Sequence, residues 1–184
     1  MSYNKEDYEF KIERNYSEEE WEVIRKQFQN VLPSIMIDSD MTTADIKFTI
    51  AKISSLLPTA LMINSYIKTD FENIENKHKS LLKSLTYDAK MASAKAAGMK
   101  TYTDSEATGK AHKVLREGKM KKIKTDENKK GYKMVRVDNG PTVEQLREMY
   151  TERYNFMYSV VESLRTKKDL LVTYGSMLKM ESAI

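Results

Sequence analysis

The sequence predicts an all-α protein built from long helices, and three observations support this. The chain has 184 residues but only 3 Pro and 6 Gly, so few positions interrupt a helix. Charged residues make up 32% of the chain and the mean hydropathy is −0.62, which favours an elongated shape with much polar surface. Apolar residues recur at steps of three and four over long stretches, which is the period of an amphipathic helix.

The first predicted helix begins with a capping box, because Ser17 is followed three residues later by Glu20. Pro33 ends this helix. Residues 1–16 contain a brief apolar alternation that suits a short strand, an extended arm or an oligomer contact. The apolar face of the helix carries Trp21, Ile24, Phe28 and Leu32.

The next apolar stretch is predicted to form two helices that meet at Pro58. The first begins after Thr42 or Thr43 and is apolar on more than one face, which indicates burial between helices or between subunits. Pro58 suits the first turn of a helix, so the second helix is predicted over residues 58–98. Its apolar stripe includes His78, which we interpret as a packed ring and not as a ligand or base.

The region after this helix is predicted to change from helix to strand. Thr103 and Glu106 form a second capping box, and Gly118 suits the end of the short helix that follows. Residues 120–137 alternate between two faces around a polar turn at residues 126–131. This pattern favours a small basic β-hairpin, with a flexible loop as the alternative.

Thr142 and Gln145 predict the start of the last long helix, which is expected to end near Gly175. This helix and the one over residues 58–98 are predicted to pair as an elongated antiparallel helical hairpin or bundle. We expect one domain, in which an acidic helical region (residues 1–57) precedes the helical hairpin (residues 58–184) with a basic arm at residues 99–138. The apolar tail from Met177 to the end predicts subunit contact, and therefore a homo-oligomer.

Positive charge is concentrated in the middle of the chain. Residues 1–76 hold 8 Lys and Arg against 14 Asp and Glu (net −6), residues 77–136 hold 17 against 6 (net +11), and residues 137–184 hold 6 against 7 (net −1). We call residues 77–136 the basic segment. Clustered positive charge with interspersed Tyr suits a phosphate backbone and unstacked bases, whereas a solvated helix face, an acidic protein or lipid are the alternatives. The predicted nucleic-acid-binding residues are Lys83, Tyr87, Lys90, Lys95, Lys100, Lys113, Lys119, Lys121, Lys122, Lys124, Lys129, Lys130, Tyr132, Lys133 and Arg136.

The sequence predicts no cofactor, no metal and no catalytic site, so the protein is expected not to be an enzyme. It has no Cys, which suits a reducing cytoplasm and excludes thiolate metal sites. Gly109 and Lys110 lack the rest of a phosphate loop, and residues 38–40 lack the later Gly and Glu of a calcium loop. No apolar run approaches the ~18 residues that a membrane span needs, and the first residues are too polar for a signal peptide. We therefore predict a cytoplasmic protein without a membrane partner.

Two stretches resemble the phage recombination mediator family called UvsY-like. Residues 81–90 (LLKSLTYDAK) are similar to its basic, Tyr-containing DNA-binding helix, and residues 164–171 (LRTKKDLL) with 177–179 are similar to its terminal helix and tail. The resemblance covers about the last 110 of the 184 residues. It implies a small helical protein of replication and recombination, in the host cytoplasm if encoded by a phage, that binds single-stranded DNA through Lys83 and Lys90. It also implies ring formation and a role in loading a recombinase in place of the single-strand-binding protein.

Together these features predict an oligomeric, non-enzymatic accessory protein that binds single-stranded DNA or RNA. A recombinase or a single-strand-binding protein is the protein partner that the resemblance implies. The alternative is a phage structural, assembly or adaptor protein whose apolar helices make subunit contacts. An enzyme is the third option, because one sequence does not exclude a site assembled between helices.

Overall fold

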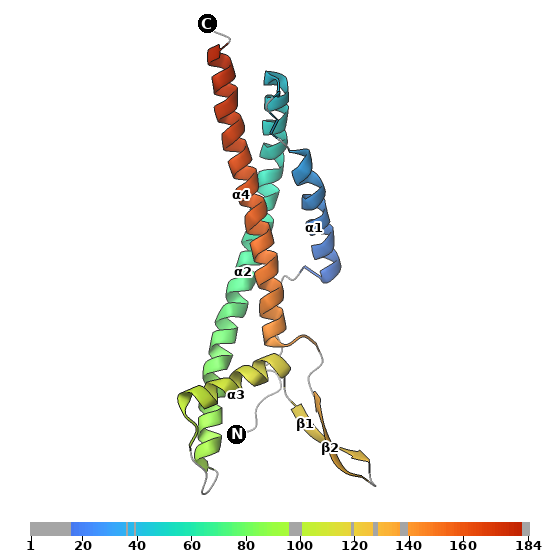
Figure 1. Ribbon diagram of the computed structural model, residues 1–184, viewed down its shortest axis with the longest axis vertical. Coiled ribbons are helices and arrows are strands. Elements are labelled where there is room, and N and C mark those ends of the chain that lie inside the picture. Colours follow the sequence, from blue (N-terminus) through green and yellow to red (C-terminus); the bar gives the residue numbers. More distant parts are fainter. Residues whose placement is uncertain are drawn as a thin grey trace. The chain divides into compact units, whose positions relative to one another are not determined.

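The structure is a computed structural model that describes residues 16–35, 37–38, 40–95, 101–118, 120–126, 129–136 and 140–181. In chain order these residues form α1 (Glu18–Val31), the short 3-10 helix η2 (Leu32–Ser34), α2 (Thr43–Lys95), α3 (Asp104–Glu117), β1 (Met120–Asp126), β2 (Lys129–Arg136) and α4 (Val143–Glu181) (Figure 1). Helices dominate, which confirms the predicted all-α class and the helical bundle.

The chain packs as two compact units. Unit 1 consists of the chain up to Asp70 together with the chain from Arg153 onward, and unit 2 runs from Phe71 to Glu152. Both units contain part of α2 and part of α4, because each long helix passes through the boundary. Unit 1 adds α1 to these helices, whereas unit 2 adds α3 and the two strands.

The most deeply buried residues of α2 and α4 repeat every seven positions, which keeps them on one side of each helix as in a coiled coil. In unit 1, Ile46 near the start of α2 lies beside Gly175 near the end of α4. In unit 2, Glu75 and His78 of α2 bond to Arg147 and Glu144 of α4. The two helices therefore pair antiparallel within each unit, as predicted. The repeating residues are Ile46, Ile53, Ala60, Ile67 and Ile74 in α2, and Tyr150, Met157, Leu164 and Leu171 in α4.

The predicted helix break at Pro58 is wrong, since α2 is one helix of 53 residues with Pro58 inside it. A proline inside a helix removes a backbone hydrogen bond and costs about 3 kcal/mol. Pro58 is exposed, whereas the buried stripe continues past it from Ile53 to Ala60. Burial of this stripe offsets the cost of the proline, so the helix continues.

The stretch that begins α2 buries one face within unit 1, because Ile46 and Ile53 are in the core whereas Phe48 is 72% exposed. Burial of its other face between subunits stays a prediction. The expected end of the last helix needs correction. The last helix does not end near Gly175 but continues to Glu181. A Cβ atom added at Gly175 would lie 3.4 Å from Cγ2 of Ile46, so the small residue permits a close approach of α2 and does not end the helix.

Helix α1 begins at the predicted capping box and packs into the core of unit 1 (Figure 1). The Glu20 backbone N–H donates to Oγ of Ser17 (3.1 Å), and the Ser17 backbone N–H donates to the carboxylate of Glu20 (2.8 Å). Trp21 and Phe28 are buried, and the Trp21 ring meets Phe156 of α4 edge-on with centroids 5.6 Å apart. The apolar face predicted for this helix therefore holds it in unit 1.

A buried arginine adds a polar anchor to this apolar core. Arg153 is 2% exposed, and its guanidinium donates to the backbone oxygen of Tyr16 (2.9 Å) and to the carboxylate of Glu18 (2.7 Å). It also lies 5.4 Å from the Trp21 ring. Burial raises the pKa of Asp70 above its ordinary value, and the positive charge of Arg153 opposes this rise. Arg153 thus ties the start of α1 to α4.

The apolar part of α2 is long as well as exposed. The Thr43–Ala94 part of this helix is long and apolar enough to cross a membrane, and 28% of its most apolar stretch is buried. Our expectation that no apolar run would reach that length is therefore not met. Core helices of soluble proteins can have the same length and composition, so this feature by itself assigns no membrane.

Candidate nucleic-acid interface

All fifteen predicted binding residues belong to unit 2. Lys83, Tyr87, Lys90 and Lys95 are on α2 and Lys113 is on α3; Lys121, Lys122 and Lys124 are on β1, and Lys129, Lys130, Tyr132, Lys133 and Arg136 are on β2. Lys100 and Lys119 lie outside the described residues. Unit 2 has 18 Lys and Arg against 12 Asp and Glu (net +6), whereas unit 1 has 13 against 15 (net −2). The charge segregation of the sequence thus coincides with the division into units.

Helix α2 carries a row of basic and aromatic side chains in unit 2. Lys79, Lys83, Tyr87 and Lys90 follow one another at steps of four, four and three, which places them on one side of the helix. Lys79 and Lys83 are exposed, Tyr87 is 63% exposed, and Lys90 is half-buried. The sequence analysis missed Lys79, although its spacing from Lys83 could have identified it. We call these four residues the α2 row.

Helix α3 carries a second basic row. Lys110, Lys113 and Arg116 follow at steps of three and are exposed. The other side of the helix buries Ala107, Ala111 and Leu115. Only Lys113 of this row was predicted, because the sequence analysis did not separate the two sides of the short helix. We call the three basic residues the α3 row.

The entry into α3 is fixed to α2 by short polar contacts. The Tyr102 backbone N–H donates to Oγ of Ser93 (3.0 Å), a buried hydroxyl that itself donates to the backbone oxygen of Lys90 (2.8 Å). Thr103 forms the predicted capping box with Glu106, and these hydrogen bonds lower the pKa of the Glu106 carboxyl. Lys90 forms an ion pair with Asp104 in the first turn of α3. The contacts of Tyr102 with Ser93 and of Asp104 with Lys90 place the start of α3 beside the α2 row.

Lys110 interacts with the aromatic ring that precedes α3. Its ammonium lies 3.6 Å from the Tyr102 ring centroid and donates to the Tyr102 hydroxyl. A cation over an aromatic face is attracted by the ring quadrupole. The first member of the α3 row is therefore held against the Tyr102 ring.

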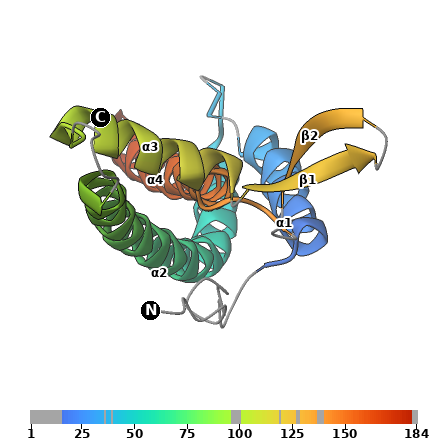
Figure 2. The same ribbon diagram turned by 90° about the horizontal axis from the view of Figure 1, so that it is seen from below.

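The two strands after α3 form an antiparallel pair (Figure 2). Met120 faces Arg136 and Lys124 faces Tyr132, with an irregularity between Lys124 and Asp126. The turn is shorter than predicted, because Asp126 and the residues from Lys129 onward belong to the strands. Gly118 ends α3 with a φ of 75°, a conformation that glycine adopts readily. The lysines of this region are assigned to β1 and β2 by their chain positions.

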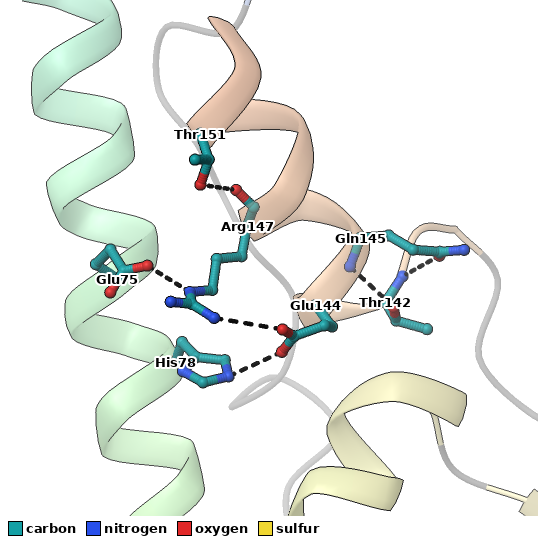
Figure 3. A network of polar contacts seen from close by, with 7 residues as sticks. All are labelled: Glu75, His78, Thr142, Glu144, Gln145, Arg147 and Thr151. Atoms are coloured by element: carbon teal, nitrogen blue, oxygen red, sulfur yellow. Dashed lines mark hydrogen bonds and ion pairs between the residues drawn. The ribbon is translucent and has the colours of Figure 1, made fainter. Parts of the chain in front are cut away.

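A polar network joins the start of α4 to α2 in unit 2 (Figure 3). His78 is 6% exposed, and its Nε2 lies 3.0 Å from Oε2 of Glu144. Arg147 donates to Glu75 and to the other oxygen of Glu144 (3.3 Å). The hydrogen bond to Glu75 raises the pKa of the Arg147 guanidinium, which stays charged. His78 is buried, as predicted, but it also has a polar partner that the sequence analysis did not predict.

The same end of α4 is capped as the sequence predicts. The Gln145 backbone N–H donates to Oγ1 of Thr142 (3.2 Å), and the Thr142 backbone N–H donates to the Gln145 side chain (2.8 Å). His112 of α3 also approaches this network, with its ring centroid 6.3 Å from that of His78. His78 therefore lies where α2, α3 and α4 meet inside unit 2.

The described residues contain no group of three or more His, Asp or Glu that could hold a metal ion. Comparison with known proteins found no matching family model, no similar curated protein and no similar solved structure. Function is therefore inferred from the charge, exposure and spacing of side chains in unit 2.

Proposed function

We propose that this protein is a non-enzymatic accessory factor that binds single-stranded nucleic acid through unit 2. The observation that carries the proposal is the α2 row, in which Lys79, Lys83 and Lys90 flank a Tyr87 ring that is 63% exposed. Lysines neutralise phosphates, and an exposed aromatic ring offers a face on which an unstacked base can stack. Bases in a duplex are already stacked, so this combination favours single strands.

The α3 row and the strands extend the same proposed surface. Lys110, Lys113 and Arg116 are exposed in the same unit, and β1 and β2 contribute further lysines by sequence. The charges are spread along several elements and lack the compact spacing of a base-reading motif. We therefore expect many weak electrostatic contacts and little sequence preference.

The wider role follows the family resemblance. A mediator that helps to load a recombinase needs a strand-binding surface and a protein partner. Unit 1 carries exposed apolar side chains, among them Phe48 (72%), Met177 (54%) and Met180 (68%), which support self-association or partner binding. A monodisperse monomer in light scattering at micromolar concentration would contradict self-association.

The central experiment is binding of a fluorescein-labelled oligothymidylate, followed by anisotropy across a salt series. If four to six lysines per subunit contact phosphates, log affinity should fall against log salt with a slope of about −3 to −4, at about −0.7 per neutralised phosphate. Replacing both Lys79 and Lys83 with Ala should flatten the slope by about 1.4. The matched control replaces Lys26 and Lys47, two exposed lysines of unit 1, and should leave the slope unchanged.

Two further variants separate stacking from charge. Tyr87→Ala should weaken binding by about 1 to 3 kcal/mol without changing the slope, whereas Tyr87→Phe should bind like the wild type. Tyr158→Ala removes a 51% exposed ring from unit 1 and serves as the control.

A fourfold variant tests the strand region. Replacing Lys119, Lys121, Lys122 and Lys124 with Ala should flatten the salt slope by up to about 3 if this region takes part in binding. Absence of binding at low salt would instead favour the structural or assembly protein.

A further inference from the structure

Lys90 differs from its neighbours on the α2 row because an acidic side chain already holds it. Its ammonium forms an ion pair with Asp104 of α3, whose side chain is 84% exposed. Lys83 and Lys79 lie on the same side of α2, about two and three turns earlier. A strand that follows the α2 row would therefore meet the carboxylate of Asp104 at Lys90.

The ion pair can open without releasing α3. The hydrogen bond from Tyr102 to Ser93 holds the start of α3 to α2 independently of this ion pair. The capping box of Thr103 and Glu106 keeps the first turn of α3 formed. Ala107, Ala111 and Leu115 bury its inner side. An exposed pair contributes little to stability, and the carboxylate of Asp104 remains well placed at the positive end of α3 after Lys90 leaves it.

A carboxylate and a phosphodiester present the same chemistry to an ammonium, since each is an anion with oxygen acceptors. We propose that the carboxylate of Asp104 binds the Lys90 ammonium where a strand phosphate would otherwise bind, and that a bound single strand displaces this carboxylate. This inference rests on the proposed function. Asp104 then competes with the strand for Lys90 and lowers the affinity of Lys90 for a phosphate. Release of the strand is then assisted, because Asp104 can take back the ammonium of Lys90.

The test compares two substitutions that each remove one negative charge from α3. Asp104→Asn removes the competitor, whereas Glu117→Gln removes an exposed carboxylate in the last turn of the same helix. Both alter the long-range electrostatic attraction of the strand in the same direction. Because exposed ion pairs are weak, we expect Asp104→Asn to bind the labelled oligothymidylate up to about fivefold more tightly than Glu117→Gln does.

A double-mutant cycle assigns the effect to Lys90. In a Lys90→Gln background, Asp104→Asn should bring no more gain than Glu117→Gln. Asp104→Glu keeps the charge and should bind like the wild type, and circular dichroism checks that α3 remains folded in each variant. The inference would be overturned if Asp104→Asn and Glu117→Gln gave equal gains in affinity, or if the extra gain of Asp104→Asn persisted without Lys90. In either case, binding by the wild type would still uphold the proposed function. Absence of wild-type binding would overturn both.

Discussion

Unit 1 and unit 2 share the same two long helices, but different forces hold their remaining elements. In unit 1, α1 packs through Trp21 and Phe28 into a core of Ile, Leu, Val and Met side chains. In unit 2, α3 and the start of α4 are attached to α2 by polar contacts at Ser93 and His78 as well as by small buried residues such as Ala107. Unit 1 has a net charge of −2 and unit 2 of +6.

The difference indicates a division of roles. Apolar burial provides most of the stability of a folded domain, so unit 1 is suited to hold the long helices together. In unit 2, the polar contacts at Ser93 and His78 help to hold α3 and α4 to α2, so the unit can expose the α2 row and the α3 row while these helices stay in place. Substitutions in unit 1 should therefore change stability, and substitutions on the surface of unit 2 should change binding.

The largest expected effect comes from the core of unit 1. Leu164 is fully buried, so Leu164→Ala should lower the free energy of unfolding by about 2 to 5 kcal/mol, through lost burial and the cavity left behind. Leu170→Ala, at a position 54% exposed on the same helix, should change it by less than about 0.5 kcal/mol. Urea unfolding measures both. The division of roles would be contradicted if folded Leu164→Ala protein bound the oligonucleotide with a different salt dependence from the wild type.

The next effect concerns the polar network of unit 2. His78→Leu should keep the helical content but lower stability by about 1 to 3 kcal/mol, because the partly buried carboxylate of Glu144 loses a hydrogen-bond partner. Hydrogen exchange should show the loss first in the opening turns of α4. His112→Leu changes an exposed ring beside the same network and should have the smaller effect. Unchanged stability in His78→Leu would show that the ring serves only as packing.

Two equivalent capping boxes allow the units to be compared directly. Ser17→Ala in unit 1 and Thr103→Ala in unit 2 should each cost about 1 kcal/mol, because each leaves a backbone N–H without its side-chain acceptor. Exchange of amide hydrogens, followed by mass spectrometry, should rise in α1 for the first variant and in α3 for the second. Equal changes in both helices for either variant would mean that the units do not respond separately.

The smallest expected effect is a pH dependence in unit 1. The pKa of Asp70 is raised above its ordinary value of 3.8 by burial, so the folded protein binds this proton more tightly than the unfolded chain. The protonated carboxyl therefore stabilises the folded protein fully at pH values below the ordinary pKa, and this stabilisation is lost as pH rises through the raised pKa. Asp70→Asn should lack this decline. Urea midpoints from about pH 3 to about pH 7 test it, and identical pH profiles for both proteins would refute it.

The helix starts could be predicted because the signals are local. Ser17 with Glu20, Thr103 with Glu106 and Thr142 with Gln145 each satisfy backbone groups within one turn, so no distant contact is needed. The basic segment was also evident from the chain, because charge counts do not depend on the fold. The all-α class followed from the scarcity of Pro and Gly together with the apolar period.

The errors arose where tertiary packing outweighed local preference. The sequence analysis places a helix start at Pro58 and a helix end near Gly175. A buried or partly buried residue nevertheless recurs every seven positions through both sites, from Ile53 to Ala60 and from Leu171 to Leu178. That seven-residue repeat was present in the sequence and would have predicted continuous helices. Burial of the repeat along a partner helix outweighs the local penalty of one Pro or one Gly.

The sequence by itself determined the helical class, the capped helix starts and the basic segment, because these depend on neighbouring residues and on composition. Only the tertiary structure decided that the side of α2 around Tyr87 is exposed, that His78 bonds Glu144, and that Lys90 is held by Asp104. The partners in the last two contacts lie far apart in the chain or on different helices. Their distances are set by how the helices pack, and a pattern along one segment carries no information about that packing.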